Sequence, residues 1–171
     1  HYDAAGLDAA AIPVETLVLP LVVIDVRGHA GRDPDHAVDL ADLAVHEAAH
    51  GTIPPGACVA MHSGWGARIA DPSFRNADAE GVMHFPGFSL ATAAVLAEAR
   101  GALALAVDTL SLDPGRSPDL PVHRFWLPSG RYGLECVANL DRVPARGATL
   151  VVGAPKIVGA TGGPCRLLAL V

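Results

Sequence analysis

The sequence has little of several features that would point to particular classes of protein. Its 171 residues include 12 Lys and Arg against 18 Asp and Glu, which gives a net charge of -6 at pH 7. No run of Lys or Arg is present that could neutralise the phosphates of a nucleic acid or of an anionic membrane. We therefore expect neither partner, and a small-molecule substrate fits the composition better.

Long hydrophobic runs and paired cysteines are also missing. The longest apolar run, Leu17–Val26, contains a proline and an aspartate and is about half as long as a membrane-spanning helix. The three cysteines, Cys58, Cys136 and Cys165, are odd in number, far apart and without a C-x-x-C pair. They predict reduced, buried thiols in a cytoplasmic protein.

What the chain does contain is enough apolar residues for one compact domain. Its residues are 51% hydrophobic and 18% charged, which is typical of a globular protein with a substantial core. We see no repeat and no linker, so a single domain over residues 1–171 is expected. Because the chain starts at His1 and not at Met, we expect this domain to lack its N-terminal part.

The order of the expected elements indicates an α/β fold. Helices are predicted at residues 39–50 and 90–100, with Asp39 and Ser89 as their N-caps. Residues 66–88 predict a long loop, which in a compact domain often borders a site. Buried strands are predicted at residues 17–26, 56–65, 102–110, 148–158 and 165–171.

One short pattern raises the possibility of a zinc peptidase. His46, Glu47 and His50 form His-Glu-x-x-His, which on a helix places two imidazoles on one face. A catalytic zinc site needs a third protein ligand, and the chain offers only Glu80, in the long loop. His50 also directly precedes Gly51, so attraction to the C-terminal end of the helix dipole accounts for it. We therefore favour a solvated helix face over a peptidase site.

The other histidines differ in their surroundings. His29, His36 and His62 are isolated, and we expect them to be surface or satisfied polar residues. His84 lies in the long loop beside Phe85 and could line a pocket. His123 ends a polar segment, and Glu135 follows twelve residues later, which by spacing alone is a weak pair.

Several longer segments give a more specific indication. "HFPGFS", "DTLSLDPGRSPDLPVHRFWL", "GRYGLECVANLDRVP" and "GATLVVGAPKIVGATGGPCRLLAL" occur in this order. Together they resemble the cyclase family of metal-dependent hydrolases, which includes bacterial kynurenine formamidase and isatin hydrolase. The resemblance extends over nearly the whole chain. It implies a mixed sheet of the swivelling β/β/α type, and a homodimer or homotetramer.

The resemblance also implies a metal centre. The family signature is His-x-Gly-Thr-His-x-Asp-x-Pro-x-His, and this sequence contains only its last histidine, matched by His1. The family gives that histidine a role in proton transfer, so His1 is the expected catalytic residue. His123 and Glu135 match two family residues that complete a zinc or manganese centre. Two protein ligands alone would hold a metal only weakly.

Aromatic residues in or beside the long loop are candidates for substrate contact. Trp65 and Phe85, with His84 between them in the chain, could form part of a pocket wall for a ring-containing substrate. The alternative, that Trp65, Phe74, Phe85 and Phe88 are ordinary core residues, is equally open.

These observations favour a metal-dependent hydrolase. It would cleave the amide bond of a cyclic amide or of an N-formyl aromatic amine with metal-activated water. One alternative is a binding or structural protein with the cyclase fold that has lost its metal site. The zinc peptidase is the weaker alternative.

Overall fold

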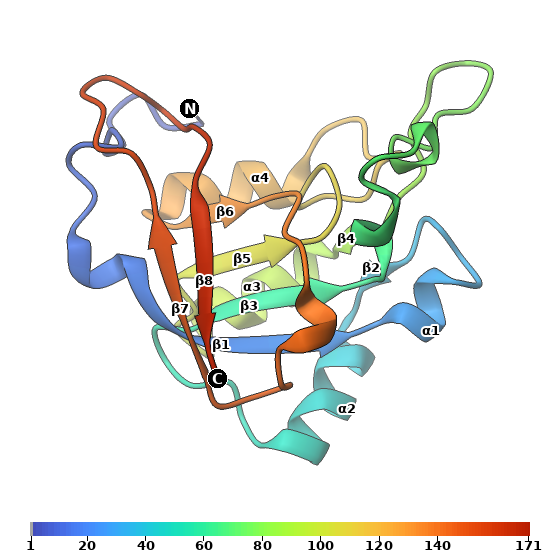
Figure 1. Cartoon of the computed structure of the whole chain (residues 1–171), viewed down its shortest axis with the longest axis horizontal. Helices are drawn as coiled ribbons and strands as arrows, with labels where there is room; N and C mark the ends of the chain where they lie inside the picture. Colours follow the sequence, from blue (N-terminus) through green and yellow to red (C-terminus); the bar gives the residue numbers. More distant parts are fainter. Residues whose placement is uncertain (1) are drawn as a thin grey trace.

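A six-stranded sheet forms the centre of the molecule in the computed structural model, which describes residues 2–171 (Figure 1). β1, β3, β5 and β6 run parallel, whereas β7 is antiparallel to both β1 and β8. Because the parallel strands end at one edge of the sheet, the residues that follow them lie near one another. In spatial order the strands are β6 (Tyr132–Leu134), β5 (Ala104–Val107), β3 (Cys58–His62), β1 (Val18–Asp25), β7 (Ala148–Gly153) and β8 (Arg166–Leu170).

The helices begin and end at residues that favour such boundaries. α2 (Leu40–His50) starts at Asp39, whose side chain accepts hydrogen bonds from two backbone N–H groups of the first turn. It stops at Gly51, which has a φ of 84°. α3 (Leu90–Glu98) is capped by the Ser89 side chain.

Two shorter helices and a small second sheet complete the regular structure. α1 (Arg27–Ala30) directly follows β1, and α4 (Pro121–Trp126) precedes β6. β2 (Ala37–Val38) pairs in parallel with β4 (Gly87–Phe88). Short 3-10 turns lie at Val14–Leu17, Trp65–Arg68, Pro72–Phe74, Leu127–Ser129 and Leu140–Arg142.

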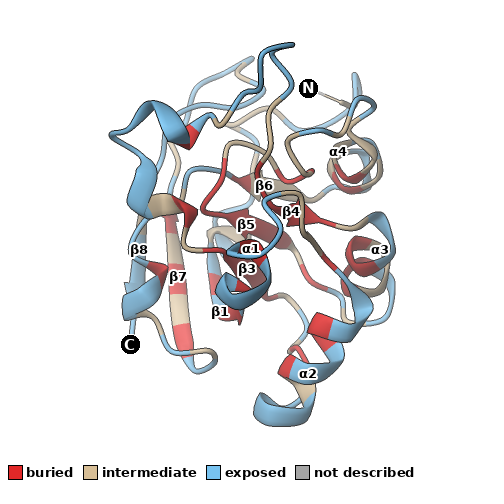
Figure 2. Ribbon diagram, turned by 90° about the vertical axis from the view of Figure 1, so that its right-hand side faces the viewer, coloured by how far each residue is buried: buried red, intermediate tan, exposed pale blue. Residues whose placement is uncertain are grey.

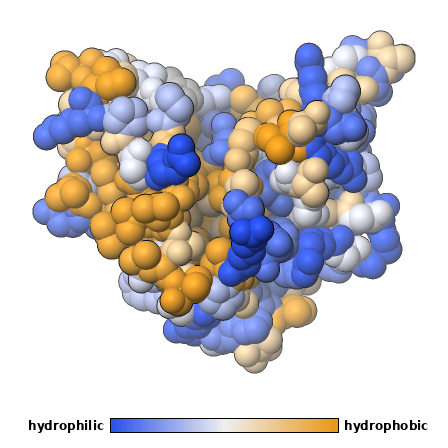
Figure 3. Space-filling model, in the orientation of Figure 1, coloured by the Kyte–Doolittle hydropathy of each residue, from blue (hydrophilic) through white to orange (hydrophobic). Residues whose placement is uncertain are grey.

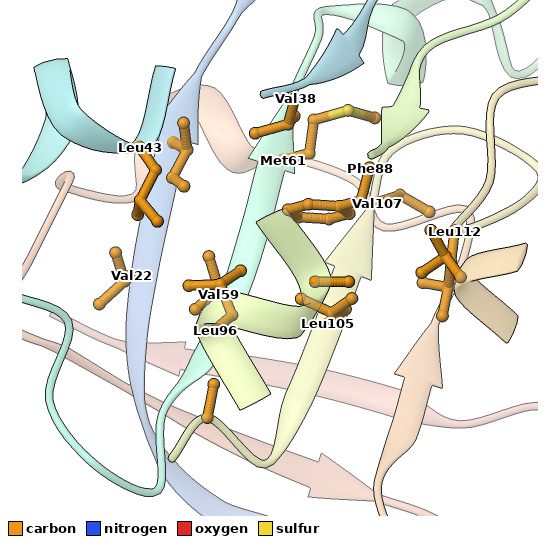
Figure 4. Close-up of a cluster of buried hydrophobic side chains, with 14 of the residues drawn as sticks. Val22, Val38, Leu43, Val59, Met61, Phe88, Leu96, Leu105, Val107 and Leu112 are labelled. Atoms are coloured by element: carbon orange, nitrogen blue, oxygen red, sulfur yellow. The ribbon is translucent and has the colours of Figure 1, made fainter. Parts of the chain in front are cut away.

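Side chains of the central strands alternate between two buried faces of the sheet. The face toward the helices carries larger residues, among them Val59, Met61 and Leu105, which pack against Leu96 of α3 and Phe88 (Figure 4). Burial of each such side chain stabilises the fold by about 1.5–3 kcal/mol. This cluster fixes the helices on the sheet.

The opposite face of the same strands carries small residues. Cys58, Ala60, Ala104 and Ala106 pack there against Leu150 of β7. Small side chains leave room for the sheet to curl, and Figure 1 shows β7 and β8 crossing in front of β3 and β5. The mixed α/β sheet that was expected is confirmed.

The five predicted strands and two predicted helices are all present, with shorter bounds. α4 and β6 were not predicted, because residues 113–123 read as turns and β6 has only three residues. The prediction that all three cysteines are buried is wrong: none is paired, but Cys136 and Cys165 are exposed. No helix among residues 2–171 is long and apolar enough to cross a membrane.

Candidate metal centre

His123 is held in place by a buried aspartate at the start of α4. Asp113 is fully buried, and its carboxylate accepts hydrogen bonds from the backbone N–H groups of Val122 (2.7 Å) and His123 (3.1 Å). The same carboxylate lies 2.7 Å from His123 Nδ1. Asp113 therefore both satisfies backbone N–H groups in the first turn of α4 and fixes the orientation of the imidazole ring.

Glu135 meets the other nitrogen of the same ring. It directly follows β6, and its Oε1 lies 3.3 Å from His123 Nε2. The His123 side chain is 12% exposed and that of Glu135 39%, so the pair faces solvent on one side. The structure thus brings together His123 and Glu135, the two residues that the family resemblance implies as metal ligands.

The surroundings of His123 fit a metal ligand. Metal-binding histidines usually present one nitrogen to the ion while a carboxylate holds the other, as Asp113 does here. Burial lowers the pKa of His123, but the hydrogen bonds to Asp113 and Glu135 outweigh it and raise the pKa to about 9. A cation on Nε2 would take the place of that proton. The donor set, one imidazole nitrogen and one carboxylate oxygen, suits zinc or manganese and is incomplete by itself.

The N-terminal end of the described chain packs on this histidine. The ring of Tyr2 lies 5.4 Å from that of His123, with the two planes inclined by 45°. The predicted catalytic residue, His1, lies outside the described residues. Its assignment stays a prediction.

The three residues predicted to bind substrate lie together but are already engaged. Trp65 and Phe85 are 2% and 1% exposed and pack with Phe74 in a small core cluster. Trp65 Nε1 donates a hydrogen bond of 2.8 Å to the Phe74 carbonyl. An apolar hollow beside this cluster is lined by Phe74 with Ile69, Pro72, Met83 and Leu110, but not by Trp65 or Phe85. Contact of Trp65 or Phe85 with substrate stays a prediction.

His84 is held between two carboxylates. Its Nδ1 lies 2.9 Å from Asp35, and its Nε2 lies 3.3 Å from Asp78. These hydrogen bonds raise the pKa of His84. Arg116 lies 3.5 Å from the same oxygen of Asp35. His84 therefore ties the long loop to two other segments, and its predicted contact with substrate stays untested.

The His-Glu-x-x-His segment does not form a metal site in this structure. Glu47 accepts hydrogen bonds from Arg100 at 2.7 and 2.8 Å and from the Ile53 backbone N–H at 3.0 Å. His46 is 7% exposed, and its Nε2 has no hydrogen-bond partner among residues 2–171. Burial lowers the pKa of His46, which favours a neutral ring. The expected solvated face is therefore wrong for His46, which is buried against the domain, whereas His50 is exposed.

Sequence reasoning missed two further groups of residues. Asp113 lies in Asp-Pro-Gly, a sequence typical of a turn, which gives no sign that its carboxylate reaches α4. His29 and His36 were read as isolated, whereas the structure brings both to Asp42. These three form the one group of three or more His, Cys, Asp or Glu side chains, within residues 2–171, whose geometry could hold a metal ion.

Known proteins give the fold and the site a context. A family model described as "Putative cyclase" matches residues 1–114. An isatin hydrolase from Roseibium aggregatum is 34% identical over 186 aligned residues, which cover 100% of this chain and 70% of that protein.

Solved structures of similar proteins agree with this chain over nearly its full length. Isatin hydrolase A from Labrenzia aggregata, bound to benzyl benzoate, has a TM-score of 0.91 and 36% identity. The match covers 98% of this chain and 66% of that one. Isatin hydrolase A from Ralstonia solanacearum has a TM-score of 0.92 and 34% identity, covering 98% and 65%. The chain therefore spans about two thirds of the length of these structures. By sequence and by fold, it belongs to the cyclase family.

Proposed function

We propose that this chain is part of a metal-dependent hydrolase that opens the amide ring of an isatin-like cyclic amide. The observation that carries the proposal is the arrangement of His123 between Asp113 and Glu135 in a member of the cyclase family. The isatin hydrolases among its relatives favour a cyclic amide over the N-formyl aromatic amine that we also considered.

The chain's own residues would divide the work as follows. His123 Nε2 and Glu135 Oε1 would hold zinc or manganese, with Asp113 fixing the histidine ring. A divalent metal, when bound, lowers the pKa of water to about 7 and polarises a carbonyl oxygen. His1 would accept a proton from the attacking water and return it to the leaving nitrogen, as an imidazole with a pKa near 6.5 can do. The contact between Tyr2, the next residue, and His123 supports this placement.

Two protein ligands hold a metal weakly, so the proposal requires further ligands. From the family resemblance, we would expect them in a His-x-Gly-Thr-His-x-Asp segment before His1. Reading the encoded sequence upstream of His1 is therefore the first test. Such a segment would support the enzyme, whereas its absence would favour a cyclase-fold protein without a metal site.

The activity test uses the full-length encoded protein, loaded with zinc or manganese. Hydrolysis of isatin and of an N-formyl arylamine is followed by absorbance, and bound metal is counted by mass spectrometry. We expect isatin opening that falls at least 100-fold in His123→Ala and in Glu135→Gln, with loss of bound metal. His50→Ala, at an exposed histidine on α2, is the matched control and should retain both. Full activity in His123→Ala would exclude the proposed centre.

We also propose that the protein acts in the cytoplasm as a homodimer or homotetramer. Apolar residues gather on the side of the molecule where β7 and β8 lie (Figure 3). Leu168 and Leu170 of the edge strand β8 are 55% and 60% exposed, and such an edge readily pairs with another strand. Light scattering of Leu168→Lys should give a smaller mass than that of the unchanged protein.

The cysteines support the proposed location. Unpaired, exposed Cys136 and Cys165 suit a reducing compartment such as the cytoplasm.

A further inference from the structure

Three potential metal ligands from separate segments meet beside the first turn of α2. His29 lies on α1, His36 precedes β2, and Asp42 lies in α2. His29 Nδ1 is 2.9 Å from Asp42 Oδ1, and His36 Nε2 is 2.8 Å from Asp42 Oδ2. All three ligand atoms lie within 4.8 Å of one another.

Two of these ligands are fixed before any ion arrives. The Asp42 side chain is 6% exposed, and its Oδ2 accepts a hydrogen bond of 3.0 Å from the Asp39 backbone N–H. The Asp39 carboxylate in turn accepts hydrogen bonds from the first turn of α2, which completes a capping box. His36 is 16% exposed, and the backbone N–H of Gly87 donates to its carbonyl. An ion would therefore meet a carboxylate and an imidazole that need little reordering.

The third ligand leaves an opening to solvent. The His29 side chain is 51% exposed, and its ring lies edge-on to that of His36 with centroids 4.8 Å apart. Both imidazoles thus turn one nitrogen toward a single carboxylate. Zinc bonds of about 2.0–2.2 Å would separate neighbouring ligand atoms by about 3–3.5 Å, slightly more than the present nitrogen–oxygen distances. Small ring rotations would make that room.

The chemistry of the group selects the class of ion. Two neutral imidazole nitrogens and one carboxylate oxygen suit divalent transition metals, and calcium and magnesium are less suited because they prefer oxygen ligands alone.

We propose that His29, His36 and Asp42 bind a divalent transition-metal ion such as zinc, at a site separate from the proposed centre at His123 and Glu135. In Figure 1 and Figure 2, α2 lies at the bottom of the molecule and α4 at the top. The ion would join α1, the segment before β2 and the start of α2. Its role is structural, since it stabilises residues 27–42 in the folded state.

The experiment counts zinc sites in the full-length protein. To remove the other centre, it starts from His123→Ala and titrates the metal-free protein with zinc chloride in a calorimeter. We expect at least one zinc equivalent per chain to remain and a rise in Tm on adding zinc. His29→Gln with His36→Gln should abolish the Tm rise and bind one zinc equivalent fewer than the parent variant. Asp42 is left unchanged because it also caps α2.

The controls separate the two sites and keep the test valid if a double variant unfolds. His29→Gln alone changes an exposed side chain, so circular dichroism should show a folded protein with weakened zinc binding. His50→Gln, at an exposed histidine on the same helix α2, should bind zinc as the parent does. Unchanged zinc binding in folded His29→Gln and in the double variant would overturn the proposal. That result would leave the proposed hydrolase untouched, because it concerns a different group of residues.

Discussion

Asp113 connects the first turn of α4 with the proposed metal ligand His123 through a single side chain. It accepts two backbone hydrogen bonds at the start of α4 and one from the His123 ring. In the proposed centre it would be a positioning residue, since it would act on the metal through His123. A change at Asp113 should therefore alter metal affinity even where the domain stays folded.

We expect Asp113→Asn to weaken metal binding by about 10–100-fold, the usual effect of changing a partner that orients a metal-binding histidine. The amide retains one acceptor oxygen but loses the charge, which should also cost about 1–2 kcal/mol of the free energy of unfolding. Competition with a chelator measures the first effect and urea unfolding the second. Asp119→Asn, at an exposed aspartate in the same segment before α4, is the control. Equal metal affinity in both variants would contradict the assigned role.

His46 is a second residue whose environment makes a definite prediction. Its Nε2 is buried without a hydrogen-bond partner in the described part of the chain, which costs about 1–3 kcal/mol relative to a satisfied group. We expect His46→Leu to leave the free energy of unfolding unchanged or to raise it by about 1 kcal/mol, as measured in urea. Hydrolysis should be retained. A loss of more than about 2 kcal/mol, beyond that of the exposed control His50→Leu, would show that the His46 ring makes a stabilising contact and would contradict the prediction.

At the scale of elements, His84 joins three loops through two carboxylates. Asp35 precedes β2, Asp78 lies in the long loop, and Arg116 from the segment before α4 also faces Asp35. Since the folded pKa of His84 is raised, the stabilisation is fully present below the unfolded pKa of about 6.5. It is lost as the pH rises through the folded pKa.

We therefore expect His84→Gln to destabilise the protein more at pH 6 than at pH 9. The urea midpoints of the variant and the parent protein, compared at both values, measure this difference. The pKa of Asp78 is lowered mainly by its hydrogen bond with His84, so its carboxylate stays charged at pH 6. His50→Gln, on the surface of α2, controls for loss of a histidine as such. A gap between midpoints that does not change with pH would refute the assignment.

The elements that could be predicted are those defined by neighbouring residues. Asp39 and Gly51 mark the ends of α2 locally, and the β-branched run in β1 identifies a buried strand without reference to the rest of the chain. α4 is different, because its first N–H groups are satisfied by Asp113, eight residues before its first helical residue, Pro121. No periodicity reveals such a contact.

The candidate site, like α4, depends on contacts between residues that are distant in the sequence. His123 and Glu135 come together because α4 and the end of β6 are adjacent in the fold, which spacing along the chain does not indicate. Only the family resemblance selected this pair. Neither the sequence pattern nor the family resemblance indicates that His29 and His36 meet at Asp42, because this contact depends on how α1 packs beside α2.

For the whole molecule, the curled sheet has one face lined by small residues. Cys58 on that face is fully buried, and burial raises the pKa of its thiol to about 12. Cys136 and Cys165, by contrast, are exposed. Alkylating reagents react with the thiolate form of cysteine. Cys58 is therefore protected from them both by its burial and by its protonation.

This difference gives the protein a natural reporter of its own unfolding. In native buffer an alkylating reagent should modify Cys136 and Cys165 first, and mass spectrometry should find Cys58 labelled only much more slowly. In denaturant all three should react. Because Cys58 is buried in the cluster that includes Leu150 of β7, its labelling requires that β7 move away from β1 and expose this face of the sheet. The rate at which the third thiol becomes labelled in native buffer therefore measures how often the sheet opens.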